Sequence, residues 1–160
     1  MGRAAHQVIG ALAAEGNRTP SINDVFRAVA ANQAARDSRT VYRSSARQRL
    51  AAAAGVYFAF FAPPAEWEFV GAEIRAVEAV FDLVWRDEKR RIWIDEIKSG
   101  LSVTSTDRRA LEEQLERIRC SGRRKYRGRF GGIRVLLLAA PARSFSVTPE
   151  GERRELAEWQ

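Results

Sequence analysis

The chain contains only one cysteine, one histidine and one methionine among its 160 residues, and its apolar runs are all short. A single cysteine, Cys120, excludes a disulfide framework and any zinc or iron–sulfur site built from this chain's cysteines alone. No apolar run approaches the roughly twenty residues that a membrane-spanning helix needs. The N-terminus also lacks the apolar core of a secretory signal, so we expect a cytoplasmic protein without a membrane partner.

Cations outnumber anions in this sequence. The 27 Lys and Arg residues and 20 Asp and Glu residues leave a formal net charge of +7, which predicts an anionic partner, nucleic acid before an acidic membrane. The length and a hydrophobic content of 46% are sufficient to bury one core, so a single domain is expected.

The first third of the chain predicts three helices. Residues 4–15 are alanine-rich and amphipathic, and a polar Ser-Ile-Asn-Asp stretch is a plausible cap for a helix over residues 24–35. A longer helix over residues 41–61 stops before Pro63 and Pro64, which cannot continue it. The helical spacing of its aromatic residues favours packing on a sheet over stacking on bases.

The rest of the chain predicts a sheet flanked by helices. We expect strands over residues 67–76, 78–85, 91–98 and 133–140, helices over 107–119 and 150–159, and a loop over 101–106. The last strand does not alternate, which is typical of a parallel or central strand. The predicted fold is therefore α/β, with a mixed sheet of about four or five strands. A helical segment over residues 1–40 packs on a core over residues 41–160, and the core ends in the short helix.

Charged residues interrupt two of the apolar strands. Asp82 lies in the run FDLVW, and Glu96 and Lys98 lie in IWIDEIKSG, with the polar turn RDEKRR between the runs. Burying an isolated charge is costly, so charges in apolar strands normally pair with one another or bind a ligand. Alternation along the strand directs Glu96 and Lys98 to the same face.

An antiparallel hairpin about this turn returns Asp82 to the level of Glu96. Two carboxylates at one level suit Mg²⁺, or Mn²⁺, which prefer oxygen ligands, and Lys98 then lies beside the attacking water or the phosphate oxygen. Asp95 is an alternative to Glu96 as the inward acid, and the register with Lys98 decides for Glu96.

This block resembles the PD-(D/E)xK nuclease superfamily, and in particular its RecB-like exonuclease branch. The matching residues are Asp82 after an apolar run, the Glu96-Ile97-Lys98 triplet, and the Ser-Gly pair that follows it. The resemblance implies a restriction-endonuclease-like fold and a metal site of Asp82, Glu96 and the backbone carbonyl of Ile97. It also implies that Lys98 is the catalytic lysine and that Gln114, on the following helix, assists.

The chain departs from the family pattern at two points. Ile118 stands where the branch has a tyrosine, four residues after Gln114. Many relatives carry an acid or histidine in the helix before the strands, and residues 40–64 contain neither, which leaves Glu73 or Glu78 as substitutes. His6 has no partner at ligand spacing and is not predicted to be a ligand.

A basic, glycine-punctuated loop over residues 120–132 is a second candidate site. Its cations alternate with two aromatic residues and are predicted to bind phosphates while a ring stacks on a base. These residues are Arg123, Arg124, Lys125, Tyr126, Arg127, Arg129 and Phe130. The alternative interpretation is a solvated basic loop.

The leading hypothesis is a magnesium-dependent deoxyribonuclease that hydrolyses phosphodiester bonds in DNA as an endonuclease or an exonuclease. The alternative is a nuclease-fold module that binds nucleic acid but cleaves poorly or not at all, within a larger complex. A third interpretation takes the N-terminal helices and the basic residues 36–43 as a loose helix-turn-helix. Those helices are otherwise expected to cover the sheet or to mediate a homodimer.

Overall fold

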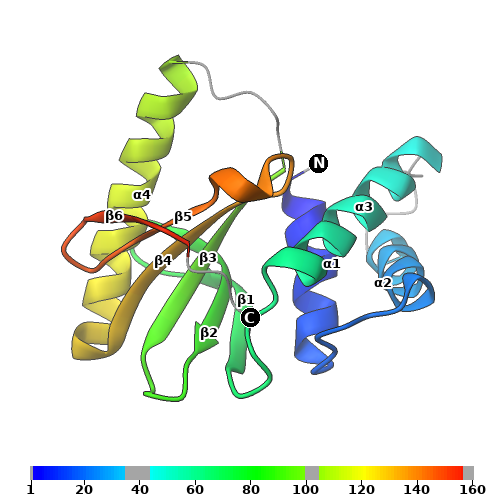
Figure 1. Cartoon of the computed structure of the whole chain (residues 1–160), viewed down its shortest axis with the longest axis horizontal. Coiled ribbons are helices and arrows are strands. Elements are labelled where there is room, and N and C mark those ends of the chain that lie inside the picture. Colours follow the sequence, from blue (N-terminus) through cyan, green and yellow to red (C-terminus); the bar gives the residue numbers. More distant parts are fainter. Residues whose placement is uncertain (1, 35–43, 100–104, 157–160) are drawn as a thin grey trace.

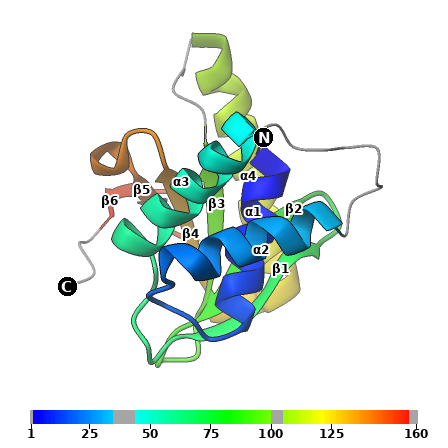
Figure 2. The ribbon, with the colours of Figure 1, turned by 90° about the vertical axis from the view of Figure 1, so that its right-hand side faces the viewer.

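A computed structural model describes residues 2–34, 44–99 and 105–156 as a mixed sheet with helices on both faces (Figure 1). The helices are α1 (Gly2–Ala14), α2 (Ile22–Ala34), α3 (Ser44–Phe60) and α4 (Ser105–Tyr126). The strands are β1 (Glu68–Arg75), β2 (Val80–Arg86), β3 (Ile92–Lys98), β4 (Phe130–Leu137), β5 (Phe145–Val147) and β6 (Arg153–Glu155). Helices α1 to α3 gather on one side of the sheet and α4 covers the other (Figures 1 and 2).

The six strands lie in the order in which they occur in the chain. Strands β1, β2 and β3 form an antiparallel meander, and α4 then carries the chain across to β4, which runs parallel to β3. Strands β5 and β6 extend the sheet in antiparallel fashion. The predicted α/β class and the central parallel position of β4 are confirmed, with six strands rather than four or five.

Two apolar layers hold the helices to the sheet. One lies between α1, α2, α3 and the sheet and includes Leu12, Tyr57 and Trp85, while the other lies between α4 and the sheet and includes Ile94, Ile118 and Phe130. The N-terminal helices are therefore part of the core. None of the helices in the described ranges is long and apolar enough to cross a membrane.

The expected cap of α2 is present as a reciprocal pair. The Ser21 hydroxyl accepts a hydrogen bond from the Asp24 backbone N–H at 3.2 Å, and the Asp24 carboxylate accepts one from the Ser21 N–H at 3.0 Å. Two expectations fall on residues outside the described ranges, wholly for the basic segment 36–43 and mainly for the loop 101–106.

The helix predicted over residues 107–119 is present, whereas the loop predicted over 120–132 and the helix predicted at the C-terminal end differ from the structure. The helix predicted over residues 107–119 continues as α4 through Tyr126, because Gly122 serves a close contact rather than a turn: a Cβ at Gly122 would lie 2.7 Å from the Phe130 ring. In the described part of the helix predicted over residues 150–159, the chain instead forms β6, which pairs with β5 from Phe145↔Glu155 to Val147↔Arg153; residues 157–159 lie outside the described ranges. Hydrogen bonding to the free edge of β5 outweighs the helical propensity of this charged segment.

Candidate functional site

The β2–β3 hairpin brings Asp82 to the carboxyl end of β3, as its spacing predicts. The two strands pair antiparallel up to Leu83↔Asp95, and Asp82 follows directly beyond that pair. Its Oδ2 atom accepts a hydrogen bond from the Ile97 backbone N–H at 2.8 Å. The first carboxylate of the predicted motif therefore lies against the backbone of the acid-x-Lys triplet.

Glu96, Lys98 and Gln114 form a closed triangle of hydrogen bonds. The Lys98 ammonium lies 2.6 Å from Glu96 Oε1 and donates to Gln114 Oε1 at 2.7 Å, while Gln114 Nε2 donates to Glu96 Oε1 at 2.8 Å. Three of the predicted site residues, from β3 and α4, are thus in direct contact.

His6, which sequence reasoning set aside, completes the cluster from α1. Its Nδ1 lies 2.9 Å from Asp82 Oδ1 and its Nε2 lies 3.1 Å from the Ile97 carbonyl oxygen, with the His6 and Asp82 side chains each only 13% exposed. Both neighbours are acceptors, so both ring nitrogens donate only when the imidazole is charged. The histidine that contacts Asp82 therefore comes from α1 and not from the helix directly before the strands.

The protonation states of this cluster are linked. Burial by itself lowers the pKa of His6, but the hydrogen bond to Asp82 and the negative charges of Asp82 and Glu96 outweigh it, so the pKa is raised above 6.5. Burial and the repulsion of Asp82 raise the pKa of Glu96 above its usual value of 4.5, against the opposing effect of Lys98 and His6. The negative charge of Asp82 therefore disfavours the ionised form of Glu96.

The two acids proposed as substitute ligands bind elsewhere. Glu73 accepts hydrogen bonds from Arg3 at 3.0 Å and from Gln7 at 3.3 Å, and Glu78 pairs with Arg124 at 3.0 Å. Among the residues that the structure describes, no recorded contact joins either acid to the cluster.

Asp95 points to the layer opposite to that of Glu96, away from Lys98 and Gln114. Asp95 is fully buried and accepts two hydrogen bonds from Arg134, at 2.6 and 2.7 Å. Tyr57 and Trp85 donate to it at 2.8 and 3.0 Å. Through Tyr57 this carboxylate links α3 to the sheet.

The oxygen donors of this cluster are chemically suited to a divalent cation. Glu96 Oε2 is buried and has no hydrogen-bond partner within the described part of the chain, and buried polar atoms are rarely left so. The Asp82 and Glu96 carboxylates and the Ile97 carbonyl are oxygen donors of the kind that Mg²⁺ or Mn²⁺ accepts. As the side chains stand, no group of three or more His, Cys, Asp or Glu residues in the described ranges is arranged to hold a metal. The donor chemistry and the unpaired oxygen fit a cation, although the carboxylates engage their neighbours.

The basic segment lies on α4 and the short helix η1 (Arg127–Arg129) that follows it, rather than on a loop. Its five cations, Arg123, Arg124, Lys125, Arg127 and Arg129, are exposed. Tyr126 packs against Phe81 with ring centres 6.2 Å apart, and Phe130 is 5% exposed, so both rings belong to the core and are not available to stack on bases. Arg123 is nine residues beyond Gln114, about 13 Å along the helix axis.

No family model, curated protein or solved structure matches this chain. The chemistry of the site is accordingly inferred from its own residues. Asp82 and Glu96 concentrate negative charge and oxygen ligands at one end of β3, and Lys98 places an ammonium beside them. Such a combination can bind a hard cation next to a phosphate.

Proposed function

We propose that this protein hydrolyses phosphodiester bonds in DNA with the help of Mg²⁺ or Mn²⁺. The convergence of Asp82, Glu96 and Lys98 at the carboxyl end of β3, with one buried Glu96 oxygen left unpaired, carries the proposal. A structural cluster would be expected to satisfy that oxygen.

Each residue of the cluster has a distinct part in the proposal. Asp82, Glu96 and the Ile97 carbonyl would hold the metal, which supplies Lewis acidity and an activated water when bound. Lys98 stabilises negative charge on the phosphate, and Gln114 holds the Lys98 ammonium in place. His6 is a positioning residue that fixes Asp82 through Nδ1.

The exposed cations supply affinity for DNA in this proposal. Arg123, Arg127 and Arg129 lie at the far end of α4 from Lys98 and are suited to phosphates along the strand. Such contacts give binding without sequence preference. The proposed setting is the cytoplasm, where a lone thiol such as Cys120 remains reduced.

Incubation with labelled single- and double-stranded DNA, in Mg²⁺, in Mn²⁺ and in chelator, tests the proposal. We expect cleavage that requires the metal and falls at least about 100-fold in Lys98→Ala, with DNA binding retained. Lys89→Ala is the matched control, because Lys89 is an exposed lysine in the β2–β3 turn. Equal cleavage by wild type and Lys98→Ala would refute the role of the lysine.

A second candidate is a DNA-binding module with the same fold that does not cut, alone, as a homodimer or within a larger complex. It is favoured by the way Lys98 and Gln114 occupy Glu96 Oε1 while the Ile97 N–H occupies Asp82. These contacts engage carboxylate oxygens that would otherwise be available to a metal. Tight binding with no cleavage under any metal is the result that selects this candidate.

A further inference from the structure

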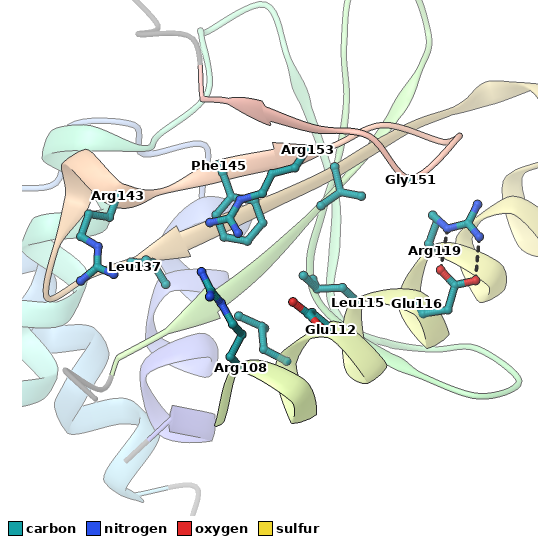
Figure 3. Close-up of a pocket in the computed structure, with 12 residues that line it drawn as sticks. Arg108, Glu112, Leu115, Glu116, Arg119, Leu137, Arg143, Phe145, Gly151 and Arg153 are labelled. Carbon is teal, nitrogen blue, oxygen red and sulfur yellow. Dashed lines mark hydrogen bonds and ion pairs between the residues drawn. The ribbon is translucent and has the colours of Figure 1, made fainter. Parts of the chain in front are cut away.

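A groove separates α4 from the β4–β5–β6 side of the sheet (Figure 3). Its volume is about 360 Å³, within the range that small-molecule sites occupy. Leu111 and Leu115 of α4 face Leu137, Phe145 and Val147 of the strands across it and form an apolar floor. None of the site residues discussed above lines this groove.

Arginines surround the apolar floor. Arg108, Arg143 and Arg153 line the groove, are exposed, and form no ion pair with any residue that the structure describes. Arg119 also lines it but is bound to Glu116 and to the Pro149 carbonyl. Unpaired cations on three sides of an apolar surface are suited to a ligand that carries both anionic groups and a ring.

Arg153 offers a planar surface as well as charge. Its guanidinium carbon lies 3.5 Å over the centre of the Phe145 ring, the separation of a stacked pair. The other face of the Arg153 guanidinium is turned away from the Phe145 ring. Guanidinium planes are surfaces on which nucleic-acid bases stack.

The groove begins beside the proposed active site. Leu137 is the register partner of Lys98 in the parallel β3–β4 ladder, and the Leu138 N–H donates to the Lys98 carbonyl at 3.0 Å. On α4, Leu111 and Leu115 flank Gln114, which binds both Lys98 and Glu96. In Figure 3 Arg108, Leu137 and Arg143 mark this end of the groove.

We infer that the groove holds a nucleotide of single-stranded DNA, with its base on the apolar floor and its flanking phosphates on Arg108, Arg143 and Arg153. A duplex keeps its bases stacked inside and offers only its phosphates, whereas a single strand brings free bases to an apolar surface. The inference deepens the proposed function and rests on it in taking DNA as the substrate: the strand in the groove continues toward Lys98.

Fluorescence anisotropy with labelled oligothymidine in chelator tests this inference without cleavage. The triple variant Arg108→Glu, Arg143→Glu, Arg153→Glu is expected to bind at least about tenfold more weakly than wild type. The slope of log affinity against log salt is expected to fall by about 2, since three phosphate contacts on a single strand are lost.

The matched control is the triple variant Arg47→Glu, Arg75→Glu, Arg117→Glu, which changes the net charge equally at exposed arginines outside the groove. If both triple variants lose DNA affinity equally, the loss reflects net charge and not the groove, and the inference is overturned. Thermal melts monitor folding, and Arg143→Glu alone replaces the groove triple if that variant does not fold.

Two further DNA probes test the floor and the strand preference. An abasic strand of the same length keeps the phosphates and is expected to bind wild type about tenfold more weakly than oligothymidine. A blunt duplex is expected to bind more weakly than the single strand. Equal affinity for either probe and oligothymidine contradicts a base on the floor.

Failure of the inference can be told apart from failure of the proposed function. Groove-dependent binding of the single strand with no cleavage in Mg²⁺ or Mn²⁺ rejects the nuclease and keeps the groove. Metal-dependent cleavage by a groove variant that binds like its control rejects the groove and keeps the nuclease.

Discussion

Asp95 and Glu96 are adjacent in β3, equally charged and almost fully buried, yet they meet opposite layers of the fold. Asp95 accepts four hydrogen bonds from Arg134, Tyr57 and Trp85 and leaves neither oxygen unpaired. Glu96 receives Lys98 and Gln114 on one oxygen, while its second oxygen is buried with no hydrogen-bond partner among the described residues.

The difference separates a carboxylate whose oxygens are all hydrogen-bonded from one that keeps an unpaired oxygen among the described residues. A bidentate arginine and two neutral donors compensate the desolvation of Asp95 as completely as a buried carboxylate allows. Glu96 lies beside a second carboxylate, and its raised pKa records that burial and Asp82 oppose its ionised form. An added cation would relieve this repulsion, whereas it would have nothing to relieve at Asp95.

The largest effect is expected from removing the charge of Asp95. Asp95→Asn leaves the Arg134 guanidinium buried without its counter-charge and should lower the free energy of unfolding by about 3–5 kcal/mol. Urea unfolding followed by tryptophan fluorescence measures this. If Asp95→Asn proved as stable as wild type, the two acids would not differ in the way described.

A smaller, pH-dependent loss is expected for His6→Gln. The folded-state pKa of His6 is raised above 6.5, so its contribution is fully present below pH 6.5 and is lost as pH rises through the folded value. Near pH 6 the variant should be about 1.5 kcal/mol less stable, the value of a hydrogen bond to a charged group. The same change in an Asp82→Asn background is the control and should have a smaller effect, because the carboxylate partner of Nδ1 is already absent while the Ile97 contact remains.

Glu96→Gln, the isosteric counterpart of Asp95→Asn, should change stability by less than about 1 kcal/mol. The amide escapes the burial penalty and the repulsion of Asp82, and this gain offsets the loss of the Lys98 ion pair. Cleavage should nevertheless be lost. A destabilisation as large as that of Asp95→Asn would mark the Glu96 cluster as structural.

The smallest effect is expected at an exposed carboxylate, Glu116, which serves as a reference for both buried acids. Hydrogen bonds from Arg119 lower the pKa of Glu116 from 4.5 to about 2, but the Glu116 side chain is 57% exposed. Its contribution, below about 0.5 kcal/mol after solvent screening, is present above pH 4.5 and is lost as pH falls toward 2. The melting temperatures of wild type and Glu116→Gln should therefore become equal as the pH falls toward 2.

Local patterns in the sequence predicted the β2–β3 hairpin and the contact between Glu96 and Lys98. Both follow from the two-residue period of a strand and from a short polar turn. Gln114 followed from the resemblance, and the structure brings it into contact with both residues. These contacts join elements that are close along the chain or linked by one crossover helix.

His6 and Arg134 were not predicted, because their partners are distant in sequence. The contact between His6 and Ile97 spans 91 residues, and the residue pattern within α1 does not predict it. A signal did exist: His6 is the chain's only histidine and lies on an alanine-rich helix, and Arg134 interrupts the apolar run of β4 directly opposite Asp95. A charge inside a buried strand already implied an opposite charge in the neighbouring strand.

The place of His6 on the first helix has a practical consequence for handling the protein. Removing the residues that precede Gly16 would delete His6, one of the groups that restrain Asp82. It would also expose the apolar face against which α1 packs. A loss of the proposed nuclease activity in such a shortened preparation would then report damage to the cluster of Asp82, Glu96 and Lys98. Purification tags are accordingly best separated from this end by a flexible spacer.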